Sequence, residues 1–75
     1  MPVKPSKIEG FEKRFGFIAI EKGFITPDDL IKALTIQVQD EIEDGSHRQI
    51  GEILLDLNIM SANQIEEVVR SIFKL

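Results

Sequence analysis

Apolar residues recur along this chain every three or four positions, which is the spacing of one face of an α-helix. The pattern is clearest in two segments of the second half, 50–57 and 65–73, and weaker around Phe11, Phe15 and Ile18. No stretch alternates apolar and polar residues in the way a half-buried strand does. The predicted helices cover residues 9–22, 27–43, 48–57 and 62–74.

The apolar pattern is duplicated within the chain. Residues 15–26 align with residues 50–61 at a constant offset of 35 positions, and each copy reads as a helix, a tight stop and a second helix. Gly23 and Asn58 stand at the two stops, where a left-handed residue closes a helix. The sequence therefore predicts an all-α fold in which two tandem helix hairpins share one core.

Capping residues mark the start of the second helix in each copy. Thr26 is a predicted N-cap because Pro27 follows it at the first helical position. Ser61 occupies the same place in the second copy, and Gln64 three residues later completes a capping box. The two copies are thus expected to begin their second helices in the same way.

The chain of 75 residues is long enough for one domain with one modest core. We expect a flexible N-terminal arm over residues 1–7 and a single helical domain over residues 8–75. Within that domain the first repeat spans 14–37, a linker spans 38–48, and the second repeat spans 49–72. Because the connections are short, consecutive helices are expected to pack against each other.

Composition and charge exclude several classes of function. The chain has no cysteine, so neither a disulfide framework nor a thiolate metal site is expected. Its net charge of −4 and the lack of a basic stripe argue against nucleic-acid binding. The N-terminus has no apolar run typical of a signal peptide, and no stretch has membrane-spanning length, so we expect a cytoplasmic protein without direct membrane insertion.

No motif for catalysis or metal binding is present. The sequence has no nucleophile in an activating context and no phosphate-binding loop, which indicates a protein that is not an enzyme and has no cofactor. His47 is predicted to be an exposed loop residue without partners for a metal ion. The acidic run 40–44 lacks the alternating ligands and central glycine of a calcium loop, so no metal site is predicted.

Several residues of the first repeat resemble a known family. The segments Arg14–Gly16 and Gly23–Thr26, followed by Leu30, Leu34 and Gln37, are similar to the N-terminal domain of type II secretion and type IV pilus assembly ATPases. The second copy, which begins at Gln49-Ile50-Gly51, resembles the same unit. The resemblance is to the non-catalytic domain of that family, so it implies no ATP hydrolysis.

Some members of that family bind cyclic di-GMP through two such units, one for each half of the dinucleotide. The resemblance implies that Arg14, the backbone at Gly16 and Gln37 would contact guanine and phosphate. In the second copy Gln49 stands at the arginine position and Ile72 at the glutamine position, so half of this signature is missing. The residues assigned to this ligand are Arg14, Phe15, Gly16, Leu30, Leu34, Gln37, Arg48, Gln49 and Gly51.

Some apolar residues fall outside the predicted core stripes and indicate a surface for a protein partner or a second copy of the chain. These residues are Phe17, Ile20, Ile31, Ile36 and Leu55. The hypothesis that follows is a non-catalytic protein-interaction or regulatory module that binds a partner such as a secretion or pilus component. The alternatives are a cyclic di-GMP sensor with a degenerate second half-site and a structural dimerisation unit.

The repeated glycines Gly16 and Gly51 carry a further prediction. Glycine is unfavourable inside a helix, so its presence at one repeat position in both copies indicates a close approach of the backbone to a neighbouring helix or to a ligand.

Overall fold

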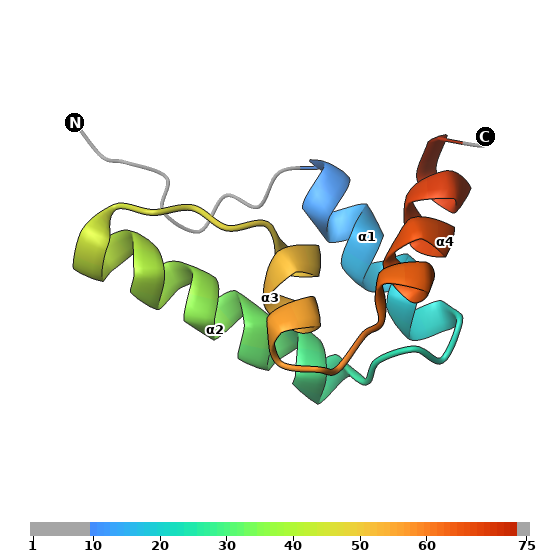
Figure 1. Ribbon diagram of the computed structural model, residues 1–75, viewed down its shortest axis with the longest axis horizontal. Helices are drawn as coiled ribbons and strands as arrows, with labels where there is room; N and C mark the ends of the chain where they lie inside the picture. Colours follow the sequence, from blue (N-terminus) through green and yellow to red (C-terminus); the bar gives the residue numbers. More distant parts are fainter. Residues whose placement is uncertain (1–9, 74–75) are drawn as a thin grey trace.

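The computed structural model describes residues 10–73, and Figure 1 shows that they form four α-helices joined by short connections. The helices are α1 (Gly10–Glu21), α2 (Pro27–Asp44), α3 (Ile50–Asp56) and α4 (Ala62–Phe73). No residue in this range belongs to a strand. The predicted all-α class is therefore confirmed, whereas the predicted arm 1–7 and the predicted helix ends at residues 9 and 74 lie outside the described residues.

Local hydrogen bonds set the start of α2 and α4. The backbone N–H of Asp29 donates to Thr26 Oγ1 at 3.1 Å, and the Thr26 N–H donates to Asp29 Oδ2 at 3.0 Å. In the second repeat the Gln64 N–H donates to Ser61 Oγ at 3.2 Å, and the Ser61 N–H donates to Gln64 Oε1 at 3.0 Å. Both predicted caps are confirmed, and each is a complete capping box.

Left-handed residues end the helices as the repeat predicts. Gly23 follows α1 with φ of 81°, and Asn58 follows α3 with φ of 60°. A third such residue, Gly45, ends α2 with φ of 76°. Most of the predicted linker 38–48 is thus helical, because α2 continues to Asp44, and the actual connection to α3 spans residues 45–49.

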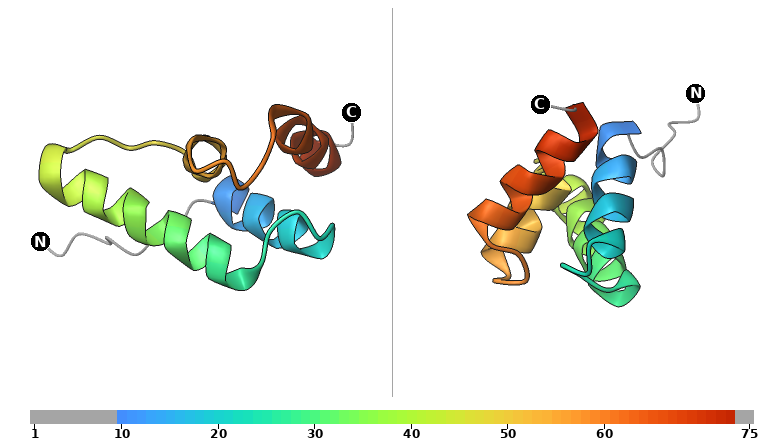
Figure 2. Two further views of the ribbon diagram at one scale, coloured as in Figure 1. Left: turned by 60° about the horizontal axis from the view of Figure 1, so that its bottom comes forward. Right: turned by 90° about the vertical axis from the view of Figure 1, so that its right-hand side faces the viewer.

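The helices of one repeat pack mainly against helices of the other. The most extensive contacts join α1 to α4 and α2 to α3, and α1 also contacts α3 (Figure 2). The two hairpins therefore share one core by interlocking. The consecutive helices α2 and α3 pack against each other as predicted, whereas the two helices within each hairpin, α1 with α2 and α3 with α4, contact each other less than we expected.

The core is built from equivalent positions of the two repeats. Ala19 and Leu54 are equivalent and both fully buried, as are Ala33 and Val68. A small residue in the first repeat therefore faces the interior where the second repeat has a larger one. Among residues 10–73 the buried apolar residues are Phe15, Ala19, Ile25, Ala33, Ile50, Ile53, Leu54, Met60 and Val68.

No helix within residues 10–73 combines the length and the hydrophobicity that crossing a bilayer requires.

Candidate functional site

An apolar cavity of about 170 Å³ opens between α3 and α4, with α1 as its floor. In the left-hand view of Figure 2, α3 and α4 lie apart and α1 lies below the gap between them. The lining residues are Phe11, Glu12 and Phe15 of α1, Gln49, Ile50, Gly51, Glu52 and Leu55 of α3 and its N-cap, and Ile65 and Val69 of α4. We call this cavity and its rim the α3–α4 groove.

Gly51 gives the groove part of its depth. A Cβ atom at this position would lie 3.3 Å from Phe15 Cζ and 3.7 Å from Ile65 Cγ2. At the equivalent position of the first repeat, a Cβ on Gly16 would lie only 2.8 Å from Leu30 Cδ2. The predicted close approach to a neighbouring helix is thus confirmed at both glycines: Leu30 of α2 packs over Gly16, and Phe15 of α1 lies close to Gly51, which also lines the cavity.

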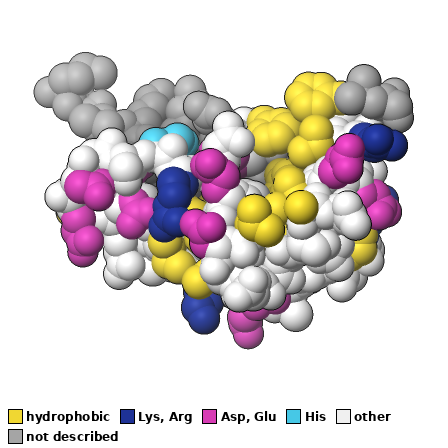
Figure 3. Space-filling model, viewed as in Figure 1, with side chains coloured by type: hydrophobic (Ala, Val, Ile, Leu, Met, Phe, Trp, Pro, Cys, Tyr) yellow, Lys and Arg dark blue, Asp and Glu magenta, His cyan; other side chains and the backbone are white. Residues whose placement is uncertain are grey.

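The rim of the groove exposes large apolar side chains. Leu55 is 42% exposed and Phe73 is 58% exposed. The Phe73 ring stacks on Phe11, with ring centroids 5.8 Å apart and planes inclined by 24°. Figure 3 shows hydrophobic side chains gathered between α3 and α4 on this face of the molecule. The only charged lining residues are the carboxylates Glu12 and Glu52, so the groove is apolar with an acidic edge.

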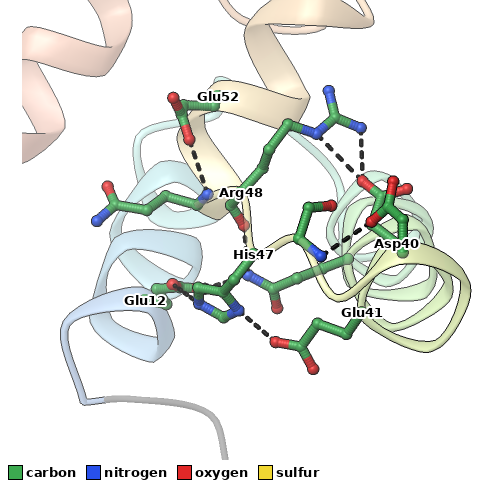
Figure 4. A network of polar contacts seen from close by, with 10 residues as sticks. Glu12, Asp40, Glu41, His47, Arg48 and Glu52 are labelled. Carbon is green, nitrogen blue, oxygen red and sulfur yellow. Dashed lines mark hydrogen bonds and ion pairs between the residues drawn. The ribbon is translucent and has the colours of Figure 1, made fainter.

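A buried polar network adjoins the groove at Glu12. This residue is 4% exposed, and Gln37 of α2 is 7% exposed. Gln37 Nε2 donates one hydrogen bond to Glu12 Oε1 at 2.7 Å and another to the Arg48 carbonyl oxygen at 2.8 Å (Figure 4). A single amide thereby joins α1, α2 and the connection 45–49.

His47 lies beside the buried carboxylate and supplies a countercharge when its imidazole is protonated. Its Nε2 lies 3.5 Å from Glu12 Oε2, an oxygen that accepts no hydrogen bond from the part of the chain described. Its Nδ1 is hydrogen-bonded to Glu41. That hydrogen bond is the largest cause of a raised pKa of His47; burial opposes it, and the charges of Glu41 and Glu12 add to it by smaller amounts. The imidazole ring of His47 therefore bridges α1 and α2.

Arg48 is held by two carboxylates. Its Nε and Nη2 donate to Asp40 Oδ2 at 3.1 and 2.8 Å, and its Nη1 donates to Asp56 Oδ2 at 2.6 Å. The hydrogen bonding of the guanidinium to Asp40 is the largest cause that raises its pKa above the ordinary value. The side chain of Arg48 thus connects the end of α2 to α3, and its charge is already neutralised within the protein.

The residues assigned to cyclic di-GMP do not all meet on one surface. Three of them, Phe15, Gln49 and Gly51, line the α3–α4 groove. The other six lie elsewhere: Arg14 is exposed, Gly16 and Gln37 are buried, and Leu30, Leu34 and Arg48 are half-buried. Gln37 and Arg48 are occupied by the contacts described above.

The predicted partner-surface residues also separate. Phe17, Ile31 and Leu55 are exposed, whereas Ile20 and Ile36 are half-buried against the core. Leu55 belongs to the α3–α4 groove, and Phe17 borders a separate shallow depression together with Ile20 and Glu21. Three further exposed apolar residues were not predicted, namely Val38, Ile42 and Phe73.

Sequence reasoning missed the pairing of Glu12 with His47. Two signals were present, because the residues occupy equivalent repeat positions and Glu12 shares a helical face with the buried Phe15 and Ala19. His47 was predicted to be an exposed loop residue, and it does lie in the connection 45–49, but it contacts two carboxylates.

No cluster of three or more His, Cys, Asp or Glu side chains suited to a metal ion occurs within the described residues. No known protein family, curated protein or solved structure matches this chain. The resemblance to the ATPase N-terminal domain therefore stays a prediction.

Proposed function

We propose that this chain is a non-catalytic protein-interaction module whose partner docks in the α3–α4 groove. The observation that supports this is the size and chemistry of the cavity. An engineered cavity of about 150 Å³ lined by Leu, Ile and Phe accommodates benzene in another protein, whereas pockets for drug-sized molecules measure about 300–1,000 Å³. A cavity of about 170 Å³ fits one large side chain of a partner.

The contacts of the polar network favour this function over a cyclic di-GMP sensor. Binding through the assigned residues would require Gln37 to leave the buried Glu12 and Arg48 to leave Asp40 and Asp56. Each of these steps exposes or unpairs a charged group, which costs free energy that the ligand would have to supply. The resemblance adds the further proposal that the partner is a cytoplasmic component of secretion or pilus assembly.

Site-specific photo-cross-linking in cells of the source organism tests this function. A photoreactive phenylalanine analogue is placed at Leu55 in the groove, and in a second variant at Ile42, which is 79% exposed on α2. We expect a discrete protein adduct from position 55 and none from position 42. Adducts from position 42 alone, or no adduct from either, would contradict docking in the groove.

The two alternatives are tested on the purified protein. Cyclic di-GMP at 100 times its dissociation constant would stabilise the fold by about 2.7 kcal/mol, and we expect no change in Tm up to high micromolar ligand. Sedimentation is expected to give a monomer. A rise in Tm would support the sensor, and a dimer that disappears when Leu55 is replaced by Lys would support self-association.

A further inference from the structure

The α3–α4 groove is formed entirely by helices, which limits what can bind there. The walls of the groove are the helices α3 and α4, so they offer no free strand edge for a β-strand to extend. A partner must therefore satisfy its own backbone before it enters an apolar cleft. An amphipathic helix does this, and α4, with 12 residues, gives it a wall about 18 Å long.

The floor of the groove determines which side chain of a partner can enter the cavity. The Phe11 and Phe15 rings lie beneath the cavity, Leu55 and Val69 lie at its sides, and Gly51, which has no side chain, is part of its lining. The volume matches one phenylalanine or leucine side chain. A partner helix would insert a single such residue, as apolar anchors do in other helix-in-groove complexes.

The edge of the groove determines which charge on a partner is attracted. Glu52 is exposed and forms no ion pair with any residue of the range 10–73. The neighbouring acid Asp56 is already paired with Arg48, and on α4 the acid Glu66 is paired with Arg70 at 3.3 Å. Glu52 is thus the acidic group on the groove that is left to attract a cation.

From the shape, the anchor volume and the charge, we propose that the α3–α4 groove binds an amphipathic helix that carries one phenylalanine or leucine anchor and a lysine or arginine one turn away. The anchor enters the cavity beside Gly51, and the cation pairs with Glu52. This inference rests on the proposed function and names the chemistry of its partner.

Selection from a displayed peptide library tests the proposal. The library presents 18-residue helical peptides with randomised faces, and the bait is the full chain. We expect enriched peptides to share an aromatic or leucine residue with a lysine or arginine three or four positions away. Enrichment of acidic peptides, of extended peptides, or of no common pattern would overturn the proposal.

Two variants locate the binding of an enriched peptide. Gly51→Ala adds a Cβ at 3.3 Å from Phe15 and improves helix propensity, so the fold is retained while the cavity shrinks. We expect affinity to fall about tenfold. The matched control is Gly10→Ala, since a Cβ at Gly10 meets nothing within 4 Å. Equal affinities for the two variants would show that the anchor does not use this cavity.

Glu52→Gln tests the charge. In the natural chain Glu52 Oε1 accepts a hydrogen bond from the Gln49 N–H at 2.9 Å. Glutamine at position 52 keeps an oxygen that accepts the same hydrogen bond, so the start of α3 is preserved. We expect affinity to fall about threefold at low salt and the difference to shrink as salt rises. The control is Glu43→Gln on the exposed end of α2. Equal effects of both variants would overturn the pairing with Glu52.

The proposed function and the proposed chemistry of the partner can be disproved separately. If the cross-link from position 55 forms but no basic helical peptide is enriched, the chain is an interaction module with a partner of other chemistry. If peptides of the expected pattern bind and no cross-link forms in cells, the groove has the stated selectivity, and the proposed cellular function is wrong.

Discussion

A carboxylate in the interior of so small a protein needs specific partners. An ion that loses its partner in a buried site costs several kcal/mol. Glu12 avoids this through the amide of Gln37 on one oxygen and the imidazole of His47 near the other. These contacts tie the connection 45–49 to α1 and α2, so they also fix where α3 begins.

Replacing Gln37 tests the buried amide. Gln37→Ala leaves both Glu12 Oε1 and the Arg48 carbonyl without their donor. We expect the free energy of unfolding, measured with urea, to fall by about 1–3 kcal/mol. Gln39→Ala removes the same type of side chain from an exposed position of α2 and should change the free energy of unfolding by less than about 0.5 kcal/mol. Equal losses would contradict the role given to Gln37.

The His47 contact predicts a pH dependence of stability. The pKa of His47 in the folded protein lies above its unfolded value of 6.5, so the protonated form favours folding. This contribution is complete below pH 6.5 and is lost as the pH rises through the folded-state pKa. We expect Tm to decline across that range in the natural chain. In His47→Asn the decline should vanish, and an unchanged profile would refute the contact.

These side-chain contacts could not be predicted from the sequence, although the backbone pattern could. The periodicity assigned Phe15 and Ile50 to the core, where both are buried. It did not assign a partner to Glu12, because the partner comes from a connection whose path depends on the packing of three helices. The lining of the groove was likewise predicted only in part, through Phe15, Gln49, Gly51 and Leu55.

The four helices are set mainly by local signals. Thr26 and Ser61 begin α2 and α4 with reciprocal hydrogen bonds, and Gly23 and Asn58 end the helices before them. Such signals act within four residues, which is why the sequence predicted them. The pairing of α1 with α4 and of α2 with α3 depends on surfaces far apart in the chain, and the sequence predicted only that they share a core.

The cap of α4 gives a prediction about one helix. Ser61→Ala removes the oxygen that accepts the Gln64 N–H, and we expect a loss of about 1 kcal/mol of unfolding free energy. Because α4 forms one wall of the groove, its first turn should also lose protection against amide hydrogen exchange. Ser71→Ala, at an exposed position of the same helix, is the control. Equal stability of the two variants would contradict the cap.

The two repeats make one molecule that is not fully symmetric. In the first repeat a Cβ on Gly16 would lie 2.8 Å from Leu30, whereas in the second repeat a Cβ on Gly51 would lie 3.7 Å from the equivalent residue Ile65, and Gly51 lines the cavity. The same local design therefore gives a packed contact between α1 and α2 and an open groove between α3 and α4. The two halves of the duplicated unit thus differ in how closely one side chain covers the repeated glycine.

Interlocked repeats should not fold separately. A fragment of residues 1–45 loses the contacts of α1 with α4 and of α2 with α3, which are the most extensive in the protein. We expect circular dichroism to show little helix in this fragment, and the full chain to unfold in one transition. A stably helical fragment would show that each hairpin holds its own core.

A competition experiment tests most directly whether the partner docks in the α3–α4 groove. The photoreactive analogue at position 55 is cross-linked in cell extract with increasing amounts of an enriched basic helical peptide, and the intensity of the protein adduct is measured. We expect the adduct to disappear as the peptide saturates the groove, and to persist with a peptide whose anchor is replaced by alanine. An adduct that survives saturation would show that the partner binds somewhere other than between α3 and α4.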